Sequence, residues 1–103
     1  MAKFKITVLK KMFDQQLAEA HCGPGAAVCP KFEEGQEFVF EGLDQPEGFC
    51  GWAWDDIHKV LLSLRSGGNF RPWMRAENNV IACCTDGIRP VVFNIERIGD
   101  GSA

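Results

Sequence analysis

The fold is decided by the stretch Val80-Ile81-Ala82-Cys83-Cys84-Thr85-Asp86-Gly87-Ile88-Arg89-Pro90-Val91-Val92-Phe93. It consists of two short apolar runs joined by Asp-Gly, the dipeptide most typical of a two-residue β-hairpin turn. The sequence therefore predicts a hairpin over residues 80–97. With a type I′ turn at Asp-Gly, the expected opposite pairs are Thr85–Ile88, Cys84–Arg89, Cys83–Pro90, Ala82–Val91 and Val80–Phe93.

Side-chain alternation divides the two adjacent cysteines of this hairpin. Because successive side chains of a strand point to opposite faces, Cys84 is expected to face the core side together with Arg89, and Cys83 to face away. A fixed positive charge near a thiol favours the thiolate form. Asp86 competes for the same guanidinium. A register error of one residue would exchange the roles of the two cysteines.

The remaining elements follow from the spacing of apolar residues. Alternation predicts strands over residues 4–10 and 37–41. A short helix is expected over residues 13–20, with Asp14 as its cap and with Phe13 and Leu17 facing inward. A long helix is predicted over residues 50–65, because one apolar stripe recurs at helical spacing and contains Cys50, Ala53, Trp54, Ile57, Leu61 and Leu64.

Two irregular features complete the predicted domain. Gly67-Gly68 is expected to end the long helix. The segment 69–79 contains Phe70, Trp73 and Met74, and these apolar residues predict that it packs over the core. The order of elements favours an α+β fold: a small, mainly antiparallel sheet of about four strands, one long helix packed on a face, and a C-terminal β-hairpin. Residues 1–98 are predicted to form a single compact domain, and residues 99–103 a frayed tail.

Composition excludes some classes of function. The chain has 103 residues, is 46% hydrophobic and 24% charged, and has a net charge of −3. It has no basic block, which argues against nucleic acid as a partner. No segment approaches the ~18 apolar residues of a membrane span, and the N-terminal residues do not resemble a signal peptide. We therefore expect a cytoplasmic protein, in which five cysteines indicate free thiols, metal ligands or catalytic groups rather than disulfides.

One hypothesis for the thiols is a soft metal ion or a cluster. Cys50 at the helix start and Cys84 in the hairpin are expected to meet under the helix. Cys29 lies in a loop, and the sequence leaves open whether this loop reaches them. The spacing of Cys22 and Cys29 matches none of the tight zinc motifs, so the site would be assembled only in space. The expected ligands are Cys29, Cys50 and Cys84, with His21 or Cys22 as a fourth, and thiolates favour zinc, iron or copper.

Two other hypotheses stay open from the residues alone. In the second, the chain is a small thiol-dependent enzyme or redox protein with Cys84 as nucleophile, Arg89 as its activator and Cys50 as resolving thiol. Trp52 lies off the apolar stripe, and an exposed tryptophan near thiols indicates a surface that binds a small molecule or cofactor. In the third, the cysteines are buried apolar side chains, and the chain is an interaction partner or a subunit of a homo-oligomer.

A resemblance to a known family singles out three of the cysteines. The segments that carry it are Cys29-Pro30-Lys31-Phe32-Glu33-Glu34-Gly35-Gln36-Glu37-Phe38, Pro46-Glu47-Gly48-Phe49-Cys50 with Trp52-Ala53, Gly67-Gly68-Asn69-Phe70, and Cys84-Thr85-Asp86-Gly87 with Arg89-Pro90-Val91 and Phe93. Over nearly its whole length the chain resembles a family of small, uncharacterised prokaryotic proteins of similar size.

The resemblance implies that Cys29, Cys50 and Cys84 are the recurring thiols of that family and that Cys22 and Cys83 are additional. Many members have proline after the last cysteine, where this chain has Thr85. The resemblance implies no substrate.

Overall fold

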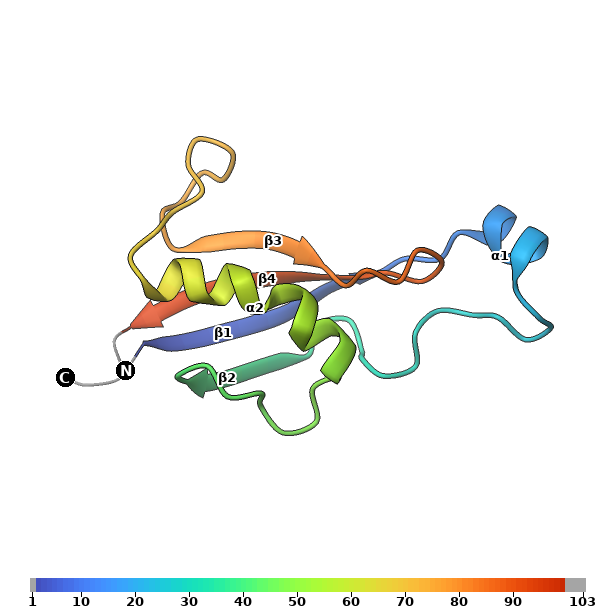
Figure 1. Cartoon of the computed structure of the whole chain (residues 1–103), viewed down its shortest axis with the longest axis horizontal. Coiled ribbons are helices and arrows are strands. Elements are labelled where there is room, and N and C mark those ends of the chain that lie inside the picture. The colour runs from blue at the N-terminus through green and yellow to red at the C-terminus, as the bar shows by residue number, and fades with distance from the viewer. Residues whose placement is uncertain (1, 100–103) are drawn as a thin grey trace.

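The computed structural model describes residues 2–99, which form one four-stranded antiparallel sheet and two helices. The sheet has the strand order β2-β1-β4-β3, built from β1 (Lys3–Lys11), β2 (Glu37–Glu41), β3 (Asn79–Cys83) and β4 (Val91–Gly99). The long helix α2 (Gly51–Arg65) packs on one face of this sheet (Figure 1). The predicted α+β fold is confirmed. Of the predicted tail, residues 100–103 lie outside the described residues.

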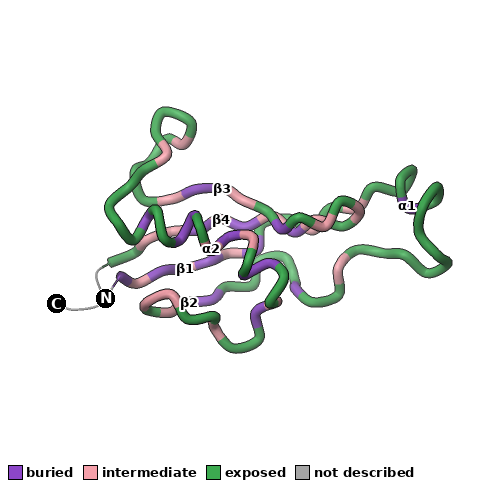
Figure 2. Tube along the Cα trace, viewed as in Figure 1, coloured by how far each residue is buried: buried purple, intermediate pink, exposed green. Residues whose placement is uncertain are grey.

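The core lies between this sheet face and α2. The alternating residues Phe4, Ile6 and Val8 of β1 are almost completely buried, as their spacing predicted. The buried stripe of α2 covers them and consists of Ala53, Trp54, Ile57, Val60, Leu61 and Leu64. Two phenylalanines from loops, Phe32 and Phe49, complete the core, with ring centroids 5.1 Å apart in an edge-on contact. Figure 2 shows the buried residues gathered in this layer.

Helix α2 ends at the predicted residue and begins one residue later than predicted. Cys50 is the N-cap residue, with extended backbone geometry. At the other end the N–H of Gly67 donates to Leu64 O (3.2 Å) and the N–H of Gly68 donates to Ser63 O (2.9 Å). Gly67 has a φ of 87°, so this is the glycine-terminated helix end of the Schellman type.

The predicted two-residue turn of the C-terminal hairpin is wrong. Ala82 pairs with Phe93 and Val80 with Ile95, so the register differs by two residues from the predicted one. Cys83 is the last residue of β3, and residues 84–90 form a longer loop. No described residue other than glycine has a positive φ, which a type I′ turn at Asp86 would require. Because the shift is even, every side chain keeps its predicted face.

The first helix, α1 (Gln15–His21), projects beyond the sheet (Figure 1). Its cap is confirmed, because Asp14 Oδ1 accepts a hydrogen bond from the N–H of Leu17 at 3.0 Å. The inward packing predicted for Leu17 is wrong: its side chain is 43% exposed, and Ala18 is the buried residue of this helix. The chain after β1 stays paired with the 84–90 loop, with Asp14 N donating to Ile88 O, and this pairing carries α1 away from the core.

The segment between α2 and β3 packs over the core only in part. Phe70 and Met74 contact the buried cluster, as predicted. Trp73 is 69% exposed, and its ring lies against that of Phe70 with the centroids 6.4 Å apart. The prediction for this segment is therefore confirmed for two of its three large apolar side chains.

Candidate functional site

Three cysteines from distant parts of the sequence line one pocket. Cys29, Cys50 and Cys84 share a pocket of about 230 Å³. Its other lining residues are Phe32, Trp52, Ala53, Asp86, Arg89 and Val91. These three thiols are the ones that the sequence singled out. We call this the thiol pocket.

Each thiol reaches the pocket from a different element. Cys84 directly follows β3 and is 9% exposed. Its backbone N–H donates to Val91 O at 3.2 Å, and its Sγ accepts the N–H of Val91 at 3.4 Å, so the sulfur is held against the start of β4. Cys50 is half-buried at the N-cap of α2, and its side chain makes no capping hydrogen bond. Cys29 is half-buried in the loop before Phe32, whose ring lies in the core.

An ion pair between Asp86 and Arg89 lies at the wall of the thiol pocket. Asp86 Oδ1 accepts the backbone N–H groups of Ile88 (2.9 Å) and Arg89 (3.0 Å), and Asp86 Oδ2 accepts Arg89 Nε at 3.2 Å. The hydrogen bond from the backbone of Arg89 is the main cause that holds the pKa of Asp86 below its ordinary value, while partial burial opposes it. The predicted pairing of Asp86 with the guanidinium is thus confirmed. The predicted position of Cys84 directly opposite Arg89 is wrong, because Cys84 pairs with Val91.

A second polar network ties the loop after β3 to the first turns of α2. Trp52 Nε1 donates to Thr85 Oγ1 at 2.8 Å. The N–H of Thr85 donates to Asp56 Oδ2 at 2.7 Å, and its hydroxyl lies 3.0 Å from the same oxygen. Trp52 lines the thiol pocket although its side chain is 65% exposed. The sequence prediction did not include Thr85 or Asp56. The available signal was the i,i+4 spacing of Trp52 and Asp56, which places both on one side of α2.

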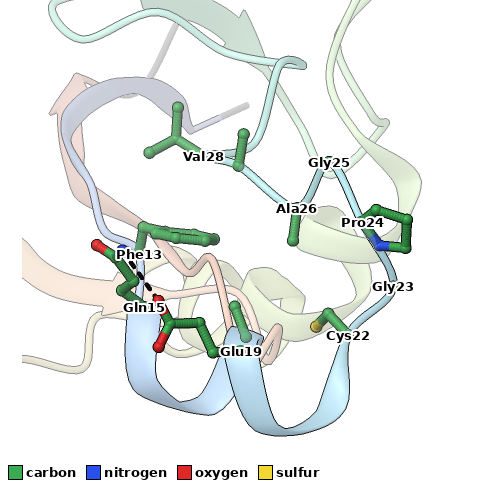
Figure 3. A pocket seen from close by; sticks show the side chains of 11 residues that line it. Phe13, Gln15, Glu19, Cys22, Gly23, Pro24, Gly25, Ala26 and Val28 are labelled. Carbon is green, nitrogen blue, oxygen red and sulfur yellow. Dashed lines mark hydrogen bonds between the residues drawn. The ribbon is translucent and has the colours of Figure 1, made fainter.

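The structure does not bring His21 or Cys22 to the thiol pocket. Cys22 is exposed and lines a different, more open pocket of about 670 Å³ beside α1 (Figure 3). The lining of that pocket contains no lysine, arginine or histidine. His21 is the last residue of α1 and is exposed. Cys83 is exposed at the end of the edge strand β3, on the sheet face opposite Cys84, as its alternation predicted.

The thiols are free, and within residues 2–99 no group of three His, Cys, Asp or Glu side chains is placed to hold a metal ion. No helix in the described part of the chain is long and apolar enough to cross a membrane.

No family model, curated protein or solved structure matches the chain. The resemblance to the three-cysteine family stays a prediction.

Proposed function

We propose that this chain is a thiol–disulfide exchange protein, with Cys84 as the nucleophile and Cys50 as the resolving thiol. The observation that carries the proposal is the convergence of Cys29, Cys50 and Cys84 on one pocket. A pocket of about 230 Å³ has room for a small organic group. Within residues 2–99, no group of three His, Cys, Asp or Glu side chains is placed to hold a metal ion. We therefore favour small-molecule chemistry over metal binding at this pocket.

The exchange has two balanced steps. In the first, the Cys84 thiolate attacks one sulfur of a small disulfide, a mixed disulfide forms, and the other half of the substrate leaves as a thiolate that takes a proton from water. In the second, the Cys50 thiolate attacks Cys84 Sγ, a Cys50–Cys84 disulfide forms, and the second substrate thiol leaves. The substrate gains two electrons and the protein loses them. A small dithiol in the solvent reverses the protein's oxidation.

The surroundings of the two sulfurs support these roles. Cys84 is nearly buried and lines the thiol pocket, so we expect a reagent to reach its sulfur through this pocket. The N–H of Val91 fixes that sulfur in one position. Cys50 is the N-cap residue of α2 and lines the same pocket, so it is the thiol that we expect to attack a mixed disulfide on Cys84.

The test compares the rates at which single cysteines form mixed disulfides. Bis(2-hydroxyethyl) disulfide is added to the reduced protein, and each adduct is located by mass spectrometry of peptides. We expect Cys84 to be modified at least about tenfold faster than an exposed thiol, followed by a Cys50–Cys84 disulfide. Cys50→Ser is expected to stop at the mixed disulfide on Cys84. Cys22→Ser, which removes an exposed thiol outside the pocket, is the matched control and is expected to change neither step.

Two results would overturn the proposal. If Cys84 reacts no faster than Cys22 and Cys83, the pocket thiols are buried apolar side chains. If the purified protein contains about one equivalent of zinc, iron or copper that is lost in each of Cys29→Ser, Cys50→Ser and Cys84→Ser, the site binds a soft metal ion. Elemental analysis of the same preparation measures the metal content.

A further inference from the structure

We propose that the substrate of the thiol pocket is a small disulfide that carries a carboxylate, and that Arg89 binds this carboxylate. The inference rests on the proposed exchange activity and adds the substrate class. Arg89 and Cys84 line the same pocket. A ligand whose sulfur contacts Cys84 in this pocket therefore lies near the cationic side chain of Arg89.

The hydrogen bonds of Arg89 leave one side of its guanidinium for a ligand. Its Nε donates to Asp86 Oδ2 at 3.2 Å. Within residues 2–99, the two terminal nitrogens of Arg89 have no hydrogen-bond partner. A guanidinium presents its N–H donors in a planar fork that matches a carboxylate in a bidentate arrangement. The free edge of Arg89 is thus a donor pair of the right shape for a carboxylate.

Asp86 fixes the position of this donor pair. Its carboxylate accepts two backbone N–H groups of its own loop in addition to Arg89 Nε. Both carboxylate oxygens of Asp86 are therefore already hydrogen-bonded within the loop. As a result, the pocket has more free hydrogen-bond donors for an anionic ligand than free acceptors for a cationic one. Because the guanidinium is held by the loop, a ligand loses little binding energy in ordering it.

Trp52 provides an apolar wall in the same pocket. Its ring is largely exposed, yet its indole N–H is bonded to Thr85, which directly follows Cys84 and is itself held by Asp56. The same hydrogen bonds therefore fix both the Trp52 ring and Thr85, the residue next to Cys84. The aromatic face can cover the carbon chain between the disulfide and the carboxylate. The volume of about 230 Å³ favours a compound of a few carbon atoms over a loop of another protein.

The test uses three disulfides of similar size and different charge: 3,3′-dithiodipropionate, bis(2-hydroxyethyl) disulfide and cystamine. For each reagent, the rate of adduct formation at Cys84 is divided by the rate at which the same reagent reacts with 2-mercaptoethanol. We expect the anionic reagent to exceed the neutral one by about tenfold, and cystamine to be slower than both, because one charge-assisted bidentate contact is gained or lost. In Arg89→Gln this preference is expected to disappear, and in Arg89→Lys to be reduced.

The matched control is Arg71→Gln. Arg71 is also a partly exposed arginine with one ion pair, to Glu77, and it does not line the thiol pocket. Its removal changes the net charge by the same amount and is expected to leave the preference unchanged. An equal loss in both variants would assign the preference to general charge and overturn the inference. Fast reaction of Cys84 without charge preference overturns the inference and leaves the exchange activity standing, whereas slow reaction with all three reagents overturns the exchange activity itself.

Discussion

Asp86 holds the 84–90 loop together by hydrogen bonds within the loop. It accepts three N–H groups, two from the backbone and one from the Arg89 side chain. Hydrogen-bond donors favour the ionised carboxylate, which is why the pKa of Asp86 lies below its ordinary value. Since Cys84 and Arg89 flank this residue in the loop, its ionised form also keeps the wall of the thiol pocket in place.

The lowered pKa of Asp86 predicts a stability that depends on pH. A carboxyl group whose pKa is lower in the folded state stabilises the fold above its unfolded pKa of about 4, and this contribution is lost as the pH falls through the lowered value. We expect Asp86→Asn to reduce the free energy of unfolding by about 1 kcal/mol at pH 7, and by less at pH 3. Urea unfolding at both pH values measures the difference. Asp44→Asn, at an exposed loop position, is the control, and a deficit in Asp86→Asn that is independent of pH would contradict the role of the charge.

Single residues also show the limit of prediction from sequence. Strand alternation and the helical stripe placed Cys84 and Cys50 on core-facing sides, and both line the thiol pocket. Neither pattern applies to a cysteine in a loop, so Cys29 entered the proposed site only as a thiol that the fold would have to bring close, and the sequence left open whether it reaches Cys50 and Cys84. His21 lies near Cys22 in sequence, but local sequence does not reveal that α1 projects from the domain.

Helix α2 is the element that positions the site, because its N-cap is Cys50 and its first turns contain Trp52 and Asp56. At its opposite end the helix is terminated by Gly67 and Gly68. A Cβ atom built on Gly68 would lie 2.9 Å from the backbone oxygen of Ser63, which is closer than real Cβ contacts. The last turn of α2 therefore accepts only glycine at this position without a shift of the backbone.

We expect Gly68→Ala to lower the free energy of unfolding by about 1–3 kcal/mol, because the last turn must open to admit the methyl group. Gly23→Ala is the matched control. Gly23 has no atom within 4 Å of a built Cβ and no positive φ, so its replacement is expected to change stability by less than about 0.5 kcal/mol. Chemical denaturation of both variants measures these values. Equal stability of the two variants would show that the last turn adapts freely.

At the scale of elements, alternation predicted the faces of the hairpin strands but not the length of their loop. Asp-Gly is typical of a tight turn, yet here Asp86 bonds to its own loop and the strands separate before it. The contact that favours the longer loop comes from elsewhere in the chain: the segment after β1 pairs with Pro90 and Ile88. Local turn propensity contains no information about such a partner.

The whole molecule is elongated, with principal extents of 51 × 31 × 21 Å. The sheet and α2 occupy one end, and α1 projects at the other (Figure 1). The thiol pocket lies where the start of α2, the end of β3 and the loop before Phe32 meet. The sequence predicted the layers because each has a clear periodicity. It could not predict the shape, because the position of α1 depends on backbone pairing with a loop far along the chain.

The distance along the chain between the pocket thiols has a consequence for the unfolded state. A Cys50–Cys84 bond would close a long loop that includes all of α2 and β3, and such a link restricts the unfolded chain much more than the folded one. By loop entropy alone, the oxidised protein is expected to be about 3–4 kcal/mol more stable than the reduced protein. For a domain of this size that corresponds to a melting temperature higher by on the order of 15 °C.

Calorimetry of the oxidised and reduced forms measures this difference, and Cys50→Ser is expected to melt at one temperature under both conditions. Equal melting temperatures of the two wild-type forms would show that the bond strains the fold by as much as it restricts the unfolded chain. With the expected difference, each turnover of the pocket would move the protein between a heat-resistant and a heat-labile form. The fraction of the protein that stays folded at elevated temperature would then depend on whether its surroundings are oxidising or reducing.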